Sequence, residues 1–242
     1  MNEAIRTVGL TKKYKDVIAV DRLDLTVNKG EIFALLGVNG AGKTTAIKML
    51  SCLTRPTEGQ AFVMGHSIIE ECDKVKALIG VSPQETAIAP NLSVRENLAL
   101  ICGVHGFSKD RMAQKIAELE EVFGLSEIKD KRACKLSGGW QRKLSLAMAL
   151  ISEPSVLFLD EPTLGLDVIA RSELWDLIRA LKGRMTVILT THYMEEAEAL
   201  SDRIAIMKSG RLLICDTSEE IKRVTGCEKF EDAFIKIVKE GK

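Results

Sequence analysis

The sequence has neither an excess of one charge nor a long apolar run. Its 34 Lys and Arg residues balance its 34 Asp and Glu residues, so the formal net charge at pH 7 is zero. A balanced chain gives no electrostatic argument for a nucleic-acid-binding surface, and we predict no nucleic-acid partner. Apolar stretches such as 98–104 and 156–159 are shorter than the roughly 18 residues that suggest a membrane span.

The sequence also lacks the marks of a secreted or zinc-binding protein. Its six cysteines form no CxxC pair, and its three histidines are scattered. We therefore interpret the cysteines as reduced thiols in the cytosol and predict no structural zinc site. Polar residues at positions 2, 3 and 6 do not fit a signal peptide.

Alternating strand and helix patterns make up most of the chain. Strands are predicted at 4–10, 18–27, 31–36, 60–65, 155–160 and 185–190, a β-hairpin at 203–215, and helices at 43–53, 168–182 and 193–200. Residues 87–150 instead are predicted to form a helical block, with a capping box at Ser93 and Glu96 and further helices from Ser108 and Gly139. The tail at 230–238 is weakly amphipathic. The pattern predicts an α/β fold with a mainly parallel sheet and crossover helices.

A glycine-rich loop follows the strand predicted at 31–36 and precedes a helix. It fits the GxxxxGK[ST] motif with Gly37, Val38, Asn39, Gly40, Ala41, Gly42, Lys43 and Thr44. The glycines let the backbone curl around phosphates, so that N–H groups point at the anion. We expect Lys43 to reach the β- and γ-phosphates and the Thr44 hydroxyl to ligate Mg²⁺. The alternative, an ordinary strand-to-helix turn, is disfavoured by the complete motif in this context.

Two carboxylates end a later apolar strand. Residues 156–159 are continuously apolar and lead into Asp160 and Glu161. A strand buried on both faces places its last residues at the carboxyl edge of the sheet, where ligands of α/β proteins bind. Asp160 is the expected Mg²⁺ partner, and Glu161 is placed to accept a proton from an attacking water. The alternative is a solvated acidic turn before Pro162.

A third segment decides the family. Ser137, Gly138 and Gly139 open the helix predicted from 139, and their hydroxyl, amides and positive helix end form a second anion site. Alone, this segment is more typical of a helix cap. Together with the other two motifs, in this order, it closely resembles the signature of ABC ATPases, and the similarity covers about residues 4–225.

The resemblance implies roles for further residues. Tyr14 matches the aromatic residue that stacks on adenine, with Val20 packing nearby, and Thr45 extends the nucleotide-binding loop. Gln84 matches the loop glutamine that senses Mg²⁺ and the attacking water. His192 matches the switch histidine at the γ-phosphate, and it joins Lys43, Gln84 and Glu161 as an expected catalytic residue. Asp167 matches the loop that crosses the dimer interface.

The resemblance also implies an architecture and partners. A single domain over 1–242 would combine a RecA-like core and a β-subdomain, at about 1–86 and 151–225, with a helical subdomain at about 87–150 and a tail at about 226–242. Two copies, in a homodimer or heterodimer, would hold each ATP between the loop of one chain and residues 137–139 of the other. A separate transmembrane permease subunit would dock on 85–97, so the chain would lie in the cytoplasm on the inner face of the membrane.

Within the family, two stretches, 191–198 and 143–147, resemble the drug-exporter and ABCA-like branch. Two positions depart from the common pattern. Trp140 stands where Gln is frequent, which suggests an exposed aromatic at a partner surface, and Leu164 stands where many members have Ser. The branch implies a transporter motor for export. The alternatives are a soluble ABC ATPase of translation, repair or assembly and a small-molecule kinase with a phosphate loop. The single core without a long heptad insert disfavours the first, and Ser137 with His192 disfavours the second.

Overall fold

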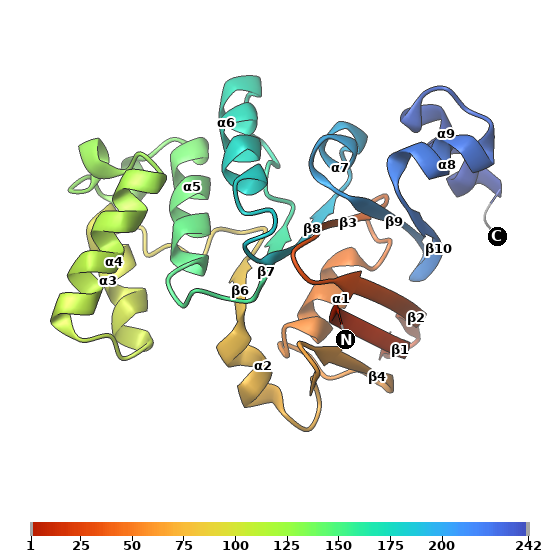
Figure 1. Cartoon of the computed structure of the whole chain (residues 1–242), viewed down its shortest axis with the longest axis horizontal. Helices are drawn as coiled ribbons and strands as arrows, with labels where there is room; N and C mark the ends of the chain where they lie inside the picture. Colours follow the sequence, from red (N-terminus) through yellow and green to blue (C-terminus); the bar gives the residue numbers. More distant parts are fainter. Residues whose placement is uncertain (1, 241–242) are drawn as a thin grey trace.

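The computed structural model describes residues 2–240. Within them, the larger sheet has six strands in the order β10-β9-β3-β8-β7-β6 (Figure 1). Neighbouring strands from β9 to β6 pair in parallel, whereas β10 pairs antiparallel to β9. The strands are β3 Ile32–Leu36, β6 Ile79–Ser82, β7 Val156–Asp160, β8 Thr186–Thr191, β9 Arg203–Lys208 and β10 Arg211–Asp216.

A second, antiparallel sheet lies beside the first and comes mainly from the start of the chain. Its order is β2-β1-β4-β5. The strands are β1 Glu3–Tyr14, β2 Val17–Asn28, β4 Glu58–Val63 and β5 His66–Ser67. The tight turn between β1 and β2 uses Lys15 in the left-handed region, at φ 50°.

Helices cover both faces of the six-stranded sheet, and three of them form a block at one end of the molecule (Figure 1). Ser93 and Glu96 make the predicted capping box at the start of α3, and the Ser108 hydroxyl accepts a bond from the Arg111 N–H at the start of α4. The helices are α1 Lys43–Leu50, α2 Cys72–Leu78, α3 Val94–Val104, α4 Lys109–Val122, α5 Gly138–Ala149, α6 Val168–Arg179, α7 Met194–Leu200, α8 Ser218–Thr225 and α9 Phe230–Glu240, with 3₁₀ turns at Ser126–Ile128 and Ala133–Lys135.

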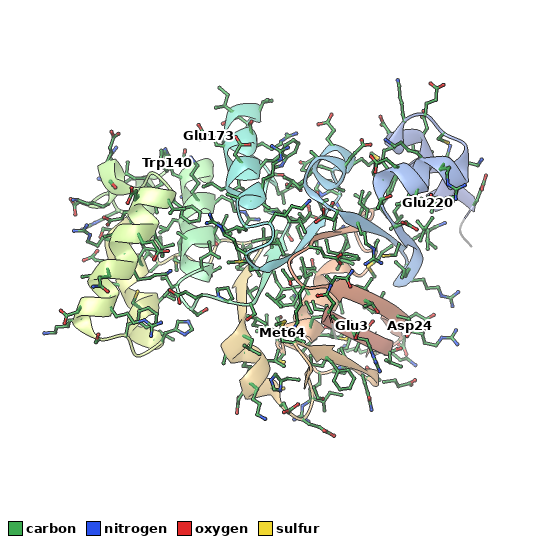
Figure 2. The ribbon with its side chains drawn as sticks, in the orientation of Figure 1. Glu3, Asp24, Met64, Trp140, Glu173 and Glu220 are labelled. Atoms are coloured by element: carbon green, nitrogen blue, oxygen red, sulfur yellow. The ribbon has the colours of Figure 1, made fainter. Side chains whose placement is uncertain are left out.

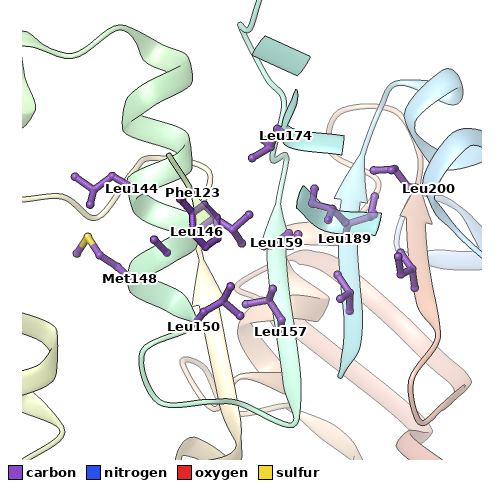
Figure 3. Close-up of a cluster of buried hydrophobic side chains, with 14 of the residues drawn as sticks. Phe123, Leu144, Leu146, Met148, Leu150, Leu157, Leu159, Leu174, Leu189 and Leu200 are labelled. Carbon is purple, nitrogen blue, oxygen red and sulfur yellow. The ribbon is translucent and has the colours of Figure 1, made fainter. Parts of the chain in front are cut away.

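The central strands are buried on both faces. All five residues of β3 and of β7 are buried, and successive residues alternate between two apolar clusters. Ala34 and Leu157 face the cluster with α5, α6 and α7, whereas Phe33 and Phe158 face the cluster with α1 and the antiparallel sheet. Figure 3 shows the first cluster, with Leu146 of α5 and Leu150 at the end of that helix beside Leu157 and Leu159 of β7. The strands therefore hold their carboxyl ends rigidly at one edge.

The predicted α/β fold, with a mainly parallel sheet, an N-terminal antiparallel β-sheet and an inserted helical block, is confirmed. The predicted division of 1–242 into subdomains stays a prediction, and residues 1, 241 and 242 lie outside the described residues. The tail is more regular than expected, because 230–240 form the helix α9. None of the helices between residues 2 and 240 combines the length and the apolar character needed to cross a bilayer.

Candidate functional site

The phosphate loop, residues 37–44, is packed so closely that two of its glycines have no room for a side chain. A Cβ atom on Gly37 would lie 2.4 Å from the Met207 carbonyl oxygen, and one on Gly42 would lie 2.3 Å from that of Ala19. Gly42 also has a φ of 100°, which L side chains rarely adopt. It is the N-cap of α1, which has neither a side-chain cap nor an acidic residue in its first turn. The positive helix end is thus left for an anion.

The Lys43 side chain folds back over the loop and is 5% exposed. Its Nζ donates to the carbonyl oxygens of Gly37, at 2.7 Å, and Val38, at 3.3 Å. It also lies 3.5 Å from Glu161 Oε1. The other oxygen of that carboxylate, Oε2, is 2.7 Å from His192 Nδ1. One buried carboxylate therefore connects the loop lysine to the histidine.

The acidic pair is fixed by β8 as well as by its own strand. Asp160 Oδ1 accepts bonds from the hydroxyls of Thr44, at 3.1 Å, and Thr190, at 2.5 Å. The Glu161 N–H donates to the carbonyl and hydroxyl oxygens of Thr190, at 3.2 and 3.0 Å. Glu161 adopts a φ of 51°, in the left-handed region that non-glycine residues rarely use. This turn sends the Glu161 side chain, 6% exposed, toward Lys43 rather than along the strand.

These groups border a cavity of about 760 Å³ at the carboxyl edge of the large sheet. Its lining contains ten of the residues that the sequence predicts: Asn39, Gly40, Ala41, Gly42, Lys43, Thr44, Thr45, Gln84, Glu161 and His192. Two others lie directly behind it, since Asp160 bonds to Thr44 and Gly37 accepts from Lys43. Residues as far apart in the sequence as Asn39 and His192 thus meet around one cavity.

The two residues expected at adenine do not line this cavity. Tyr14 lies at the end of β1, is 45% exposed, and has Lys12 Nζ 5.0 Å from its ring centroid. Val20 is fully buried in the core below the loop. Their predicted contact with nucleotide stays a prediction.

Sequence reasoning missed five lining residues. Val17, Ile18 and Ala19 at the start of β2, Leu164, and Ser209 in the β9–β10 turn all border the cavity. Val17 and Ile18 are 66% and 48% exposed, which is unusual for apolar side chains at a strand start. That pair of apolar residues directly after a polar turn was the available signal. Ser209 gave none, because the pairing of distant strands brings it there.

Residues 137–139 lie away from this cavity within one chain. Ser137 is the N-cap of α5, has no side-chain cap bond to the helix, and is exposed together with Gly138. Gly139 packs closely on α6, because a Cβ atom there would lie 3.0 Å from Cβ of Ala170. The structure therefore presents a second uncapped helix end, on a different part of the surface.

The two departures from the common pattern occupy different surroundings. Trp140 is half-buried rather than exposed, because it packs against the core, with Lys143 Nζ 4.5 Å from its ring centroid. Figure 2 shows Trp140 at the start of α5 and Glu173 on the neighbouring helix α6, where Glu173 pairs with Lys143 at 2.7 Å. Leu164 is 41% exposed at the cavity. Asp167 caps α6 through its side chain.

A further carboxylate lies buried on α7, the helix that follows His192. Glu196 on α7 is 1% exposed, and its Oε1 accepts bonds from the Thr163 hydroxyl, at 2.8 Å, and from Trp175 Nε1, at 3.2 Å. Burial raises the pKa of Glu196 above its usual value, although the bonds oppose the shift. Glu196 thus ties the segment after Glu161 to α6 and α7.

The donor set at the cavity fits a hard divalent cation. The Thr44 hydroxyl and the Asp160 carboxylate already lie 3.1 Å apart, and the Gln84 amide reaches the same cavity. Hydroxyl, carboxylate and amide oxygens are the ligands that Mg²⁺ prefers, usually completed by phosphate and water. Between residues 2 and 240, no cluster of three or more His, Cys, Asp or Glu side chains could hold a metal by itself. The site therefore suits a cation that arrives with a phosphate ligand.

Comparisons with known proteins agree with this chemistry. The ABC transporter family matches residues 20–164. The chain is 43% identical to the daunorubicin resistance ATP-binding protein DrrA3 of Streptomyces coeruleorubidus, over 94% of this chain and 72% of that protein. It is 41% identical to the phospholipid-transporting ATPase ABCA3 of Homo sapiens, over 88% of this chain and 12% of that protein.

A solved structure resembles the whole arrangement. The dimeric post-hydrolysis state of the ATP-binding cassette MJ0796, bound to ADP and Pi, superimposes with a TM-score of 0.80. It is 25% identical and covers 88% of this chain and 98% of that chain. These relatives match the predicted drug-exporter and ABCA-like branch, and they favour a transporter ATPase over the non-transport alternative. The chain belongs to the ABC transporter family, as an ATP-binding subunit that hydrolyses ATP.

Proposed function

We propose that this chain binds Mg²⁺-ATP and hydrolyses it to drive export through a separate transmembrane subunit. The observation that carries the proposal is the position of Glu161. Its carboxylate lies at the cavity between Lys43, at 3.5 Å, and His192, at 2.7 Å. A buried carboxylate beside a phosphate loop is placed to take a proton from water that attacks the γ-phosphate.

Each residue of the site has a role that follows from its surroundings. Lys43 would exchange its carbonyl and Glu161 partners for phosphate oxygens when nucleotide enters. His192 would hold the γ-phosphate side and keep the Glu161 carboxylate in place. Thr44, Asp160 and Gln84 would hold Mg²⁺, which supplies charge neutralisation between the β- and γ-phosphates when bound.

The adenine end of the site would lie at the β1–β2 hairpin. Tyr14 is exposed there, and the nearby Val17 and Ile18 line the cavity. An exposed aromatic ring next to exposed apolar side chains supports stacking of a base on Tyr14. Val20, buried beneath, would support the hairpin rather than touch the base.

The hydrolytic site is proposed to be completed by a second copy or a related chain. Within one chain, the uncapped end of α5 at Ser137 is exposed and is not part of the cavity lining. The same residues of a partner would add a hydroxyl and helix N–H groups to the γ-phosphate. Hydrolysis would then require dimer closure, which gives the chemical step a mechanical consequence.

The membrane subunit is proposed to dock beside Gln84. A groove of about 190 Å³ lies between β6 and the helical block, and it is lined in part by Ala87, Ile101 and His105. Leu100 and Val104 on the same helix are 49% and 75% exposed. Apolar side chains exposed on a helix that also lines a groove support a protein interface. A chain attached in this way would work in the cytoplasm, peripheral to the inner face of the membrane.

ATP hydrolysis is tested first in the purified chain. Lys43→Ala should lower turnover by about 10²–10³-fold, because it removes the cation that faces the phosphates. Lys48→Ala is the matched control, since Lys48 is exposed on the same helix. Equal ATPase rates for Lys43→Ala and wild type would contradict the proposed site.

The direction of transport needs the complete transporter. Everted membrane vesicles that contain both subunits should accumulate substrate when ATP is added outside, and Lys43→Ala vesicles should not. Accumulation by right-side-out vesicles loaded with ATP would instead indicate import.

A further inference from the structure

One buried arginine connects the signature segment to the hydrolytic residues. Arg142 lies on α5, one turn beyond residues 137–139, and is 5% exposed. A guanidinium has five N–H donors, and all five of its hydrogens can be assigned to separate backbone carbonyls. Nε donates to Pro162, at 2.6 Å. One terminal nitrogen donates to Pro83, at 2.6 Å, and Gln84, at 3.2 Å, and the other to Asp160, at 2.8 Å, and Glu161.

The five carbonyls belong to only two segments. Residues 83–84 follow β6 and contain the glutamine at the cavity, whereas residues 160–162 begin with the last residue of β7 and contain the acidic pair. Asp160 is still paired in the sheet, but the other four bonded carbonyls lie beyond the ends of β6 and β7, where the β-ladder does not fix them. The guanidinium plane therefore sets the distance between the two segments, and the distance of both from α5.

Burying this cation is unfavourable unless every donor is used. Burial lowers the pKa of Arg142, although the charges of Asp160, Glu196 and Glu161 oppose the shift. Lysine has three donors on one nitrogen and could not bond five divergent carbonyls. The site thus requires the planar fork of arginine, not only a positive charge.

We propose that Arg142 is a positioning residue that couples the two half-sites of one chain, holding Gln84 and Glu161 in register with residues 137–139. This inference rests on the proposed function. A displacement of the first turn of α5, where a partner's nucleotide would bind, would pass through Arg142 to the carbonyls of Gln84 and Glu161. The positions of Gln84 and Glu161 in one chain would then depend on whether nucleotide is bound at the other site, which residues 137–139 of that chain complete.

The test uses two variants and a matched control. Arg142→Lys keeps the charge, and Arg142→Gln keeps part of the hydrogen bonding. The control is Arg203→Lys, because Arg203 also bonds a backbone carbonyl, that of Thr26 at 3.0 Å, but far from the cavity lining. If replacing a bonded arginine lowers stability in general, the two Arg142 variants and Arg203→Lys should all show that loss of stability.

Amide hydrogen exchange without nucleotide gives a readout that does not depend on ATP hydrolysis. Peptides that contain 83–85 and 160–163 should exchange faster in both Arg142 variants, while the central strands remain protected. With ATP, kcat should fall by about 10²-fold and KM should change little, because a misplacement of about 1 Å has that effect on rate. Arg203→Lys should retain the wild-type kcat.

A double-mutant cycle separates positioning from general damage. If Arg142 acts mainly through Glu161, Arg142→Lys should lower kcat by less than about threefold in a Glu161→Gln background, because coupled residues are not additive. A full and additive loss would overturn the inference, as would wild-type kcat and exchange in Arg142→Lys. If both Arg142 variants fail to fold, Arg142 is needed for folding rather than for placement, and the inference also fails. An inactive wild-type chain would refute the proposed function, whereas the exchange result would still judge the role of Arg142.

Discussion

Replacing Glu161 by glutamine tests the centre of the proposed mechanism. The substitution keeps the shape of the side chain and removes a charge from a residue that is 6% exposed. That charge lies 3.5 Å from Lys43 Nζ. ATP must displace it, because the same lysine has to face the phosphates. Glutamine removes both the proton acceptor and the competitor of the γ-phosphate.

The two effects have opposite signs. Loss of a general base lowers turnover by about 10²–10⁴-fold. Affinity for ATP should rise, because the carboxylate no longer repels the γ-phosphate from the same cavity. Lys43 keeps its bonds to Gly37 and Val38, at 2.7 and 3.3 Å, so the loop itself should remain folded. The variant is therefore expected to accumulate as an ATP-bound dimer.

The assay combines turnover with gel filtration at high protein concentration, with and without Mg²⁺-ATP. Glu153→Gln is the matched control, because Glu153 also has a positive φ, 53°, and pairs with a lysine, Lys115, at 3.1 Å. It should hydrolyse ATP like wild type and show no trapped dimer. Full activity of Glu161→Gln, together with strictly monomeric elution, would refute both roles of Glu161.

Three further predictions concern the second copy, the membrane partner and pH. A Lys43→Ala chain mixed equally with a Ser137→Arg chain should recover about a quarter of wild-type ATPase activity, since half of the dimers would be mixed and each mixed dimer would contain one intact site of two. No recovery in verified mixed dimers would count against a shared site. Ala87→Glu should lower co-purification with the transmembrane subunit by more than about tenfold, because docking would bury the new charge against the partner, whereas Val122→Glu, on the exposed side of α4, should not. We choose Ala87 over the neighbouring Ile88, which packs against the core, so that a folding defect does not obscure the result. Burial raises the folded-state pKa of Glu196 above its ordinary value of 4.5, so the folded chain binds this proton more tightly than the unfolded chain does. The free energy of unfolding therefore falls as pH rises above 4.5, by at most about 1.4 kcal/mol per pH unit. Glu196→Gln should remove this contribution from the free energy of unfolding, measured by urea denaturation between pH 5 and pH 8. An unchanged pH dependence would contradict the raised pKa of Glu196.

The sequence predicts the parts of the site that are contiguous along the chain. The phosphate loop is eight successive residues, and its glycines are needed for local reasons, such as the φ of 100° at Gly42. The acidic pair ends a strand whose continuous apolar character is visible without a structure. The capping box at Ser93 and Glu96 is equally local, and its predicted bonds are present. These features can be predicted because the residues that form each of them lie close together in the sequence.

The elements that were missed are short or polar. The helix α2 has seven residues and leads directly into β6, so neither element has room for a clear period. The helix α8 did carry a signal, because the Thr217 hydroxyl accepts the Glu220 N–H at its start and Gly226 ends it at φ 68°. Thr217, three residues before Glu220, is an ordinary helix start. The signal was present, and attention to capping residues rather than to hydrophobic period would have found it.

Arg142 shows why another part of the site could not be predicted. Sequence patterns reveal a contact when its partner has a recognisable side chain, as Glu161 does for Lys43. All the bonds of Arg142 end on backbone carbonyls, which every residue possesses, so no residue type at positions 83–84 or 160–162 indicates its partner. What the sequence does show is an arginine one turn into an amphipathic helix, a position where a charge is normally solvated. Only the pairing of β6 with β7 places both groups of carbonyls under that helix, and the cation becomes buried because the backbone saturates it.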